Sequence, residues 1–247
     1  MTKKILITGA SSGLGAGMAK EFAKRGYNLA ICARRLDRLE TLKTELEHQY
    51  GVKIIVKTLD VTNYEQVSEV FKAFKQDFGQ LDRIIVNAGV GEGRRIGKGH
   101  FDINRKTAET NFISALAQCE AAVEIFRKQN SGHLVVISSM SAIRGLPKHL
   151  STYAASKAGI AHLAEGIRAE LINTPIKVST IFPGYIRTEL NEGAKQLPFE
   201  IDEKTGSRLL VKVIEKQPVK AYVPQWPWLP IGIAMKILPL KLVNKLS

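Results

Sequence analysis

The chain has 247 residues, of which 45% are hydrophobic and 24% charged, as in an ordinary soluble globular protein. Its formal charge of +13 is spread along the chain without a like-charge block or an aromatic-interleaved basic motif, which argues against nucleic-acid binding. The two cysteines lie in apolar runs and the five histidines do not fall at metal-ligand spacing, so neither a disulfide framework nor a metal site is expected.

Strand-like and helix-like segments alternate from the start of the chain. An apolar strand is predicted at 3–8, after an N-terminus too short for a signal peptide, so we expect a cytoplasmic protein. A Gly- and Ser-rich turn then leads into a helix that stops at Gly26. Further strands are predicted at 27–33, 52–59 and 81–86, with helices between them. This alternation, without repeat or linker, predicts a parallel doubly wound α/β sheet in one domain.

The second half continues the alternation after a Gly- and Arg-rich loop at 90–99. One long helix is predicted from about 102 to 128. The unbroken apolar run at 133–138 is typical of a central strand in a parallel sheet. His133 and the other histidines are expected on the surface or in loops rather than as ligands. The remaining predicted elements are a helix at 152–172, a strand at 176–182, a helix at 200–216 and a strand at 219–223.

The turn Gly9-Ala-Ser-Ser-Gly-Leu-Gly15 lies where the first strand meets the first helix. Its glycines allow a tight turn and close approach to a pyrophosphate, and free N–H groups at the helix start favour negative charge. The next strand ends in Arg34 and Arg35, where an acid would bind the ribose hydroxyls of NAD. Guanidinium groups instead suit a 2′-phosphate, so the sequence predicts NADP(H). The alternative is a basic helix start on the surface.

Tyr153 and Lys157 are four residues apart on a predicted helix and therefore project from one face. An ammonium group beside a phenol favours the phenolate and lowers the pKa of the tyrosine. Such a tyrosine donates or accepts protons near neutral pH. An isolated pair with this spacing also occurs on solvated helix faces, so its meaning depends on the other motifs.

Taken in order, these motifs resemble those of the short-chain dehydrogenase/reductase family. They are Thr8-Gly-Ala-Ser-Ser-Gly-Leu-Gly15, Asn87-Ala-Gly89, Asn111, Ser138-Ser139, Tyr153-x-x-x-Lys157 and Pro183-Gly184. The resemblance covers residues 1 to about 223. It implies a Rossmann-type sheet of seven parallel strands, flanked by helices on both faces, with NADP(H) across its carboxyl edge. It also implies hydride transfer between the nicotinamide and a carbonyl or secondary alcohol.

The resemblance implies a role for each matching residue. Tyr153 would be the general acid/base, Lys157 would lower its pKa and bind the nicotinamide ribose, and Ser139 would hydrogen-bond the substrate oxygen. Asn111 would hold a water that links Lys157 to solvent. The implied cofactor-binding residues are Gly9, Ser11, Ser12, Gly13, Leu14, Gly15, Arg34, Arg35, Asp60, Val61, Asn87, Ala88, Gly89, Tyr153, Lys157, Pro183, Gly184, Ile186 and Thr188.

Two features of the predicted site are not determined by the family resemblance. Fourteen residues separate Ser139 from Tyr153, one more than in many family members, so Ser138 and Ser141 remain alternatives as the substrate donor. The segment 189–199 is expected to form a mobile lid, but its mixed composition does not identify a substrate.

Residues 224–247 form an apolar and basic C-terminal extension beyond the domain at 1–223. Prolines interrupt it, so it is too broken for a membrane span, and we expect it to pack on the domain, a neighbouring subunit or a membrane surface. The family implies a homodimer or homotetramer. We expect an NADP(H)-dependent reductase of a lipophilic ketone or aldehyde. The alternative is a non-catalytic NADP(H)-binding sensor or membrane-associated scaffold.

Overall fold

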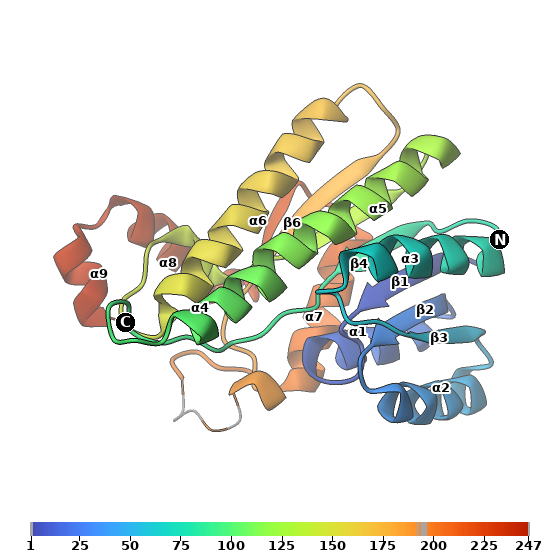
Figure 1. The fold of residues 1–247 in the computed structure, drawn as a ribbon, viewed down its shortest axis with the longest axis horizontal. Helices are drawn as coiled ribbons and strands as arrows, with labels where there is room; N and C mark the ends of the chain where they lie inside the picture. The colour runs from blue at the N-terminus through green and yellow to red at the C-terminus, as the bar shows by residue number, and fades with distance from the viewer. Residues whose placement is uncertain (1, 192, 194–196, 247) are drawn as a thin grey trace.

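The computed structural model describes residues 2–191, 193 and 197–246. In this part of the chain, seven parallel strands form a single sheet (Figure 1). The strands are β1 (Lys4–Thr8), β2 (Asn28–Ala33), β3 (Ile54–Thr58), β4 (Arg83–Val86), β5 (His133–Ile137), β6 (Lys177–Pro183) and β7 (Lys220–Val223). Their order in the sheet is β3-β2-β1-β4-β5-β6-β7. The prediction of a doubly wound, seven-stranded parallel sheet is confirmed.

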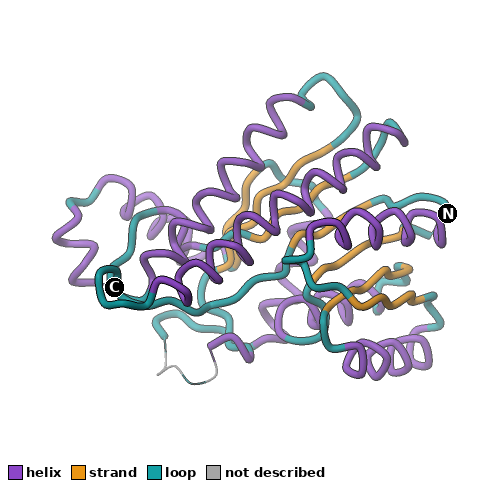
Figure 2. Tube along the Cα trace, viewed as in Figure 1, coloured by secondary structure: helices purple, strands orange, loops and turns teal. Residues whose placement is uncertain are grey.

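Helices cover both faces of the sheet, as Figure 2 shows, and each layer closes its own core. Successive strand residues point to opposite faces, so Ile5 and Ile7 belong to one core and Leu6 to the other. The first core is covered by α1 (Gly13–Ala23), α2 (Leu36–Tyr50) and α7 (Glu203–Glu215). The second is covered by α3 (Tyr64–Phe78), α5 (Ser114–Gln129) and α6 (Leu150–Glu170).

Local capping residues explain where several helices begin and end. The Asn63 side chain accepts a hydrogen bond from Gln66 N at the start of α3. Asp202 does the same for Thr205 N at the start of α7, which therefore begins three residues later than the 200–216 prediction. Gly51 follows α2 with a φ of +65°, a left-handed conformation that glycine adopts at little cost.

The predicted helix at 102–128 is interrupted near its start. It consists of α4 (Phe101–Ala108), a π-helical turn η1 (Glu109–Ile113) and α5. A π-helical turn contains an extra residue, and such turns are common at functional sites. Here the turn carries the buried residue Asn111.

The C-terminal extension forms α8 (Gln225–Ile237) and α9 (Leu240–Leu246), which lie at the end of the molecule opposite the N-terminus (Figure 1). The chain kinks at Trp226, whose φ and ψ of −98° and 131° are not helical. Beyond it, Trp228 packs against Met140 and Phe182 of the domain. Among the described residues, no helix combines the length and hydropathy needed to cross a membrane.

His133 lies in a buried polar chain, contrary to its expected place on the surface. Arg83 Nε donates to His133 Nδ1 at 2.8 Å, so the imidazole proton is on Nε2, which lies 2.8 Å from Ser179 Oγ. The Ser179 hydroxyl in turn donates to the Pro218 carbonyl. Burial lowers the pKa of His133 to about 3, and the charges of Arg83 and Lys3 act in the same direction. This strand residue is therefore a neutral part of the core.

Candidate active site

The candidate site lies at the carboxyl edge of the sheet, where β1 and β4 are neighbours and the strand order reverses. Thr8 at the end of β1 connects the two strands. Its hydroxyl accepts hydrogen bonds from Asn87 N at 3.0 Å and Ala88 N at 3.1 Å. Asn87 Nδ2 donates to Thr8 O at 2.9 Å. The expected cofactor-side turn Asn87-Ala-Gly89 is thereby held beside the glycine turn.

The glycine turn has no space for side chains at two of its positions. A methyl group at Gly15 would lie 2.2 Å from Gly9 O, and one at Gly9 would lie 2.9 Å from Ala88 Cα. Gly9 also has a φ of +66°, which disfavours any other residue. The first turn of α1 contains no acid, and Ser12 at its N-terminus makes no side-chain capping bond. The backbone N–H groups at this terminus are therefore suited to an anion.

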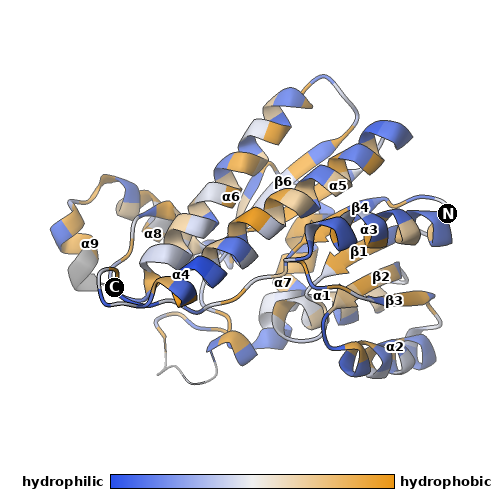
Figure 3. Cartoon of the chain, viewed as in Figure 1, coloured by the Kyte–Doolittle hydropathy of each residue, from blue (hydrophilic) through white to orange (hydrophobic). Residues whose placement is uncertain are grey.

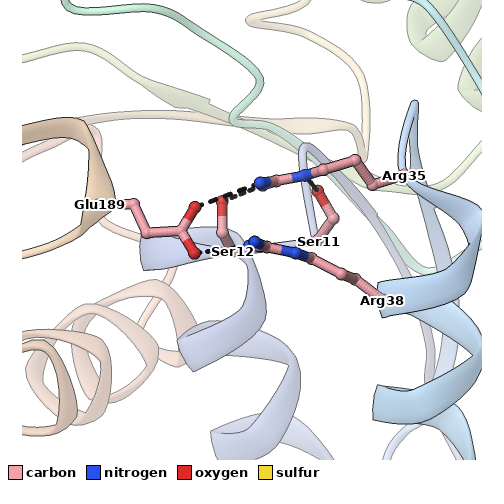
Figure 4. Close-up of polar contacts among 5 residues, drawn as sticks. All are labelled: Ser11, Ser12, Arg35, Arg38 and Glu189. Atoms are coloured by element: carbon pink, nitrogen blue, oxygen red, sulfur yellow. Dashed lines mark hydrogen bonds and ion pairs between the residues drawn. The ribbon is translucent and has the colours of Figure 1, made fainter.

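Beside this turn, two arginines bind the carboxylate of Glu189 (Figure 4). Arg35 directly precedes α2, and Arg38 lies in its first turn. We call Arg35, Arg38 and Glu189 the arginine clasp. Arg35 donates to Ser11 Oγ at 3.2 Å, to Ser12 Oγ at 2.6 Å and to Glu189 Oε2 at 3.2 Å. Arg38 donates to Glu189 Oε1 at 2.5 Å. The hydrogen bond from Arg38 is the main reason that the pKa of Glu189 is lowered.

The sequence predicts that Arg34 and Arg35 together bind the cofactor, but the structure places only Arg35 in the arginine clasp. Arg35 lies at the serines of the glycine turn, and its partner in binding Glu189 is Arg38, which was not among the predicted site residues. Arg34 is exposed and close to Asp60 instead. Burial would raise the pKa of Asp60, but hydrogen bonds from Thr62 and the charge of Arg34 together lower it. A second arginine three residues after Arg35, on the same face of α2, was the signal available in the sequence.

Tyr153 on α6 lies against Ser139, which follows β5. The Ser139 side chain is close enough to the phenol to lower the pKa of Tyr153, and Ser139 Oγ accepts a hydrogen bond from Ser141 N at 3.1 Å. The Ser138 hydroxyl is turned elsewhere and donates to the Lys157 carbonyl at 2.7 Å. Of the three alternative serines, Ser139 is therefore the one whose hydroxyl meets Tyr153.

Lys157 is buried and donates from Nζ to the Ile137 carbonyl at 3.0 Å. Burial lowers its pKa to about 8. Burial also raises the pKa of Tyr153, although the hydrogen bond with Ser139 lowers it and the nearby Tyr185 raises it further. In this arrangement desolvation outweighs the other influences on Tyr153, and the Lys157 ammonium group binds the Ile137 carbonyl. The lowering of the tyrosine pKa by Lys157 stays a prediction for the protein with its cofactor bound.

Asn111 lies on the π-helical turn with its amide directed at the loop after β4. Its Oδ1 accepts from Val90 N at 2.8 Å, and its Nδ2 donates to Val90 O at 2.9 Å and to Ser156 Oγ at 3.3 Å. A methyl group at Gly89 would lie 3.0 Å from Asn111 Oδ1 and 3.5 Å from Lys157 Nζ. Asn111 and Lys157 therefore meet at Gly89, with the Asn111 amide engaged by the Val90 peptide group.

The motif Pro183-Gly184 ends β6 and leads to the base of the lid. Gly184 N donates to Val223 O at 2.8 Å, which ties this turn to the end of β7. A methyl group at Gly13 would lie 3.3 Å from Thr188 Cβ, so Thr188 faces the glycine turn, and the buried Ile186 bridges to Ile201. The expected lid continues through η3 (Glu189–Asn191), while its residues 192 and 194–196 lie outside the described residues.

Trp228 from the C-terminal extension also belongs to this edge, which no sequence motif indicated. A methyl group at Gly184 would lie 2.0 Å from Trp228 Nε1, so the indole packs directly on the glycine. The ring makes edge-to-face contacts with Tyr185 at 5.3 Å and Phe199 at 6.2 Å between centroids. Its buried Nε1–H has no hydrogen-bond partner within the described part of the chain. The extension therefore supplies an aromatic wall next to the Tyr153 site.

Comparisons with known proteins agree with this geometry. The family model "short chain dehydrogenase" matches residues 3–197. An uncharacterized oxidoreductase of Mycobacterium tuberculosis is 47% identical over 246 residues, which cover 99% of this chain and 97% of the relative. The chain therefore belongs to the short-chain dehydrogenase/reductase family of oxidoreductases.

Solved structures show the same architecture. An alcohol dehydrogenase from the archaeon Thermococcus sibiricus, complexed with 5-hydroxy-NADP, is 25% identical with a TM-score of 0.81, covering 90% of this chain and 96% of its own. A short chain dehydrogenase/reductase of Burkholderia phymatum, in complex with NAD, has a TM-score of 0.84 over 100% of this chain and 95% of its own. At 20% identity, the second likeness concerns the fold alone.

Proposed function

We propose that this protein is an NADP(H)-dependent carbonyl reductase whose reaction is reversible as the oxidation of a secondary alcohol. The observation that carries the proposal is the placement of Ser139 against Tyr153, beside the buried Lys157, at the carboxyl edge of the sheet. Two neighbouring hydroxyl groups suit an oxygen that gains negative charge during reduction.

The residues at this edge fit a dinucleotide with a 2′-phosphate. The first turn of α1 has no acid and no side-chain cap, and Glu189 is an internal anion held by Arg35 and Arg38. A 2′-phosphate carries more charge than this carboxylate and would replace it in the clasp. The Thermococcus sibiricus relative with its 5-hydroxy-NADP supports the same choice. Asp60, Val61 and Asn87 to Gly89 would contact the adenine half, and Lys157, Ile186 and Thr188 the nicotinamide half.

The cofactor supplies the hydride when it is bound. Tyr153 donates its phenolic proton to the substrate oxygen as negative charge develops there, while the Ser139 hydroxyl hydrogen-bonds that oxygen. The ammonium group of Lys157 stabilises the tyrosinate that remains. In the oxidative direction, the tyrosinate accepts the proton of the alcohol. Burial raises the pKa of Tyr153, so the phenol is in the protonated form that reduction requires.

The surroundings of Tyr153 favour a lipophilic ketone or aldehyde. Tyr185, Trp228 and Phe199 form the aromatic wall, and Ile143 and Met140 lie in the cluster behind it. Such a wall binds an apolar substituent by burial of its surface.

Replacing Tyr153 tests the proposal most directly. NADPH oxidation is measured over a panel of aliphatic and aromatic ketones and aldehydes, and we expect turnover by the wild type. Tyr153→Phe removes only the hydroxyl and should lower kcat about 100-fold or more, while the dissociation constant for NADPH changes little. Tyr64→Phe, an exposed tyrosine of α3, is the matched control. Undiminished turnover by Tyr153→Phe would exclude the proton-donor role.

A further inference from the structure

The C-terminal helices α8 and α9 pack on the domain with some of their residues and expose other large apolar residues to solvent. On the inner side, Trp228 and Gly232 are buried, and a methyl group at Gly232 would lie 3.3 Å from Met140 Cε. Val243 of α9 is buried in a cluster with Leu146 and Ala154 of the domain. The two helices are therefore packed on the domain and do not need another surface to hold them in place.

The outer side is nevertheless composed of large apolar residues. Trp226 is 78% exposed and Ile237 is 77% exposed. Ile233, one helical turn before Ile237, is also exposed, as are Leu240 and Leu242. We call these five residues the outer face, and Figure 3 shows the hydrophobic colouring of α8 on which much of it lies. A helix that is apolar all round is normally buried on all sides, so this face lacks a partner.

The lid carries a further exposed apolar residue beside the C-terminal helices. Phe199 is exposed, yet its ring contacts Trp228 edge to face at 6.2 Å between centroids. Phe199 therefore lies next to the extension and at the aromatic wall of the candidate site.

The charged side chains of the C-terminal segment are of one sign. Lys236 and Lys241 are exposed between its apolar residues, and Arg144 donates to the Lys236 carbonyl at 3.3 Å. Residues 216–247 contain five lysines and no acid. An anionic surface complements this pattern, and tryptophan with apolar residues and lysines is typical of segments that lie at a lipid headgroup boundary. A second copy in a twofold contact would instead bring like lysines together.

We propose that the outer face and Phe199 dock on an anionic phospholipid membrane. The apolar side chains enter the boundary between headgroups and acyl chains, and Lys236 and Lys241 bind the lipid phosphates. The contact is peripheral, since α8 and α9 are too short to span a bilayer. It brings the aromatic wall beside the lipid phase, from which a lipophilic substrate enters directly. The docking itself does not depend on the proposed reductase activity.

Vesicle flotation of the full-length protein tests the proposal. We expect binding to vesicles of phosphatidylcholine with phosphatidylglycerol, weaker binding to phosphatidylcholine alone, and loss of binding at high salt. Trp226→Ser with Ile237→Ser should lower the partition coefficient about tenfold or more. Lys236→Glu with Lys241→Glu should lower it similarly for the anionic vesicles only. All four side chains are exposed, so the thermal unfolding midpoint serves as the check on folding.

Ile172→Ser is the matched control, because Ile172 is 75% exposed just beyond the far end of α6. It should bind both kinds of vesicle as the wild type does. Absence of binding, or equal binding by the wild type and the Trp226/Ile237 variant, would overturn the proposal. Sedimentation is measured in parallel without lipid. A dimer that dissociates in that variant, together with no vesicle binding, would assign the face to a second copy and also overturn it.

Discussion

Glu189 joins residues that are far apart in the chain, since it comes after β6 and binds two arginines that follow β2. The same two guanidinium groups are the proposed partners of a 2′-phosphate, so the carboxylate and the cofactor compete for them. Glu189→Gln removes the charge but keeps the shape. We expect the dissociation constant for NADPH to fall several-fold and that for NADH to stay constant, as measured by titration calorimetry.

Arg38→Gln gives the opposite change and completes the test. It should raise the dissociation constant for NADPH about tenfold, because a charged hydrogen bond to phosphate is lost. Lys24→Gln replaces an exposed lysine before β2 and should leave the dissociation constant for NADPH unchanged. If Glu189→Gln instead weakens NADPH and NADH equally, the carboxylate orders the lid rather than competing with the cofactor.

The pKa of Lys157 predicts how reduction depends on pH. Burial lowers this pKa to about 8, so the side chain is a cation below that pH and neutral above it. Reduction needs the positive charge beside the developing tyrosinate, so kcat/KM for NADPH should decline as pH rises through about 8. Lys157→Met should be slow at all pH values and lack this decline. A decline at the same pH in that variant would mean that another group titrates.

Local patterns were sufficient to find most of the candidate residues. The glycine turn, Ser139, Tyr153 and Lys157 depend on short spacings, and the structure brings them to one edge of the sheet. Arg38 and Trp228 could not be identified in this way. Their importance comes from contacts with Glu189 and Gly184, which are distant in the chain and meet only through the order of the strands.

At the scale of elements, Gly184 in the turn after β6 packs directly against Trp228 of helix α8. A methyl group at Gly184 would lie 2.0 Å from Trp228 Nε1, so Gly184→Ala should displace the indole and the helix that carries it. Overpacking of this kind costs about 1–3 kcal/mol of unfolding free energy. Urea denaturation measures the loss, and proteolysis should show earlier cleavage within 224–247.

Gly166→Ala on α6 provides the comparison for Gly184→Ala. Apart from the neighbouring backbone of its own helix, no atom lies within 4 Å of a methyl group at this position, and alanine is the better helix former. The variant should be neutral or up to about 1 kcal/mol more stable. Equal unfolding curves for both variants would show that α8 moves aside without cost.

The elements themselves follow from periodicity, but one of their details does not. The helix predicted at 102–128 is divided by the π-helical turn at Glu109–Ile113. An extra residue in a turn leaves the apolar spacing of the sequence almost unchanged. The π-helical turn is stabilised by hydrogen bonds between the Asn111 side chain and the Val90 peptide group. These bonds form only where the helix packs against the loop after β4, so the sequence pattern does not reveal them.

At the scale of the whole molecule, the buried chain of Arg83, His133 and Ser179 makes stability depend on pH. The folded pKa of His133 is about 3 and the ordinary value is 6.5. Between these values the unfolded chain binds a proton and the folded chain does not. The free energy of unfolding should therefore fall with pH from about 6.5 toward 3, with a contribution of about 1.4 kcal/mol per pH unit from this residue.

Urea unfolding at a series of pH values checks this dependence. His133→Gln should be less stable at pH 7, because a buried pair of hydrogen bonds is disturbed, but its stability should change less steeply below pH 6.5. The exposed His162→Gln should follow the wild type. An unchanged slope in His133→Gln would assign the acid sensitivity to the carboxylates.

The sheet, its helical layers and its single domain could be predicted because strands and helices alternate with clear turn signals. The buried chain around His133 could not, since Arg83, Ser179 and Pro218 lie on or beside three other strands. A histidine at the start of an apolar run has the same sequence signature whether it faces solvent or two buried partners. Strand register decides between these cases, and it exists only in the folded sheet.

The two tryptophans also give the molecule two separate optical reporters. They are the only indoles in the sequence, and they differ in surroundings, since Trp226 is 78% exposed and Trp228 is 5% exposed. Trp226→Phe leaves a single emitter packed on Gly184, whose fluorescence overlaps the absorption band of reduced nicotinamide. In that variant, energy transfer from Trp228 to reduced nicotinamide reports whether the active site is occupied. In Trp228→Phe, the emission of Trp226 reports changes in the surroundings of the outer surface of the C-terminal helices.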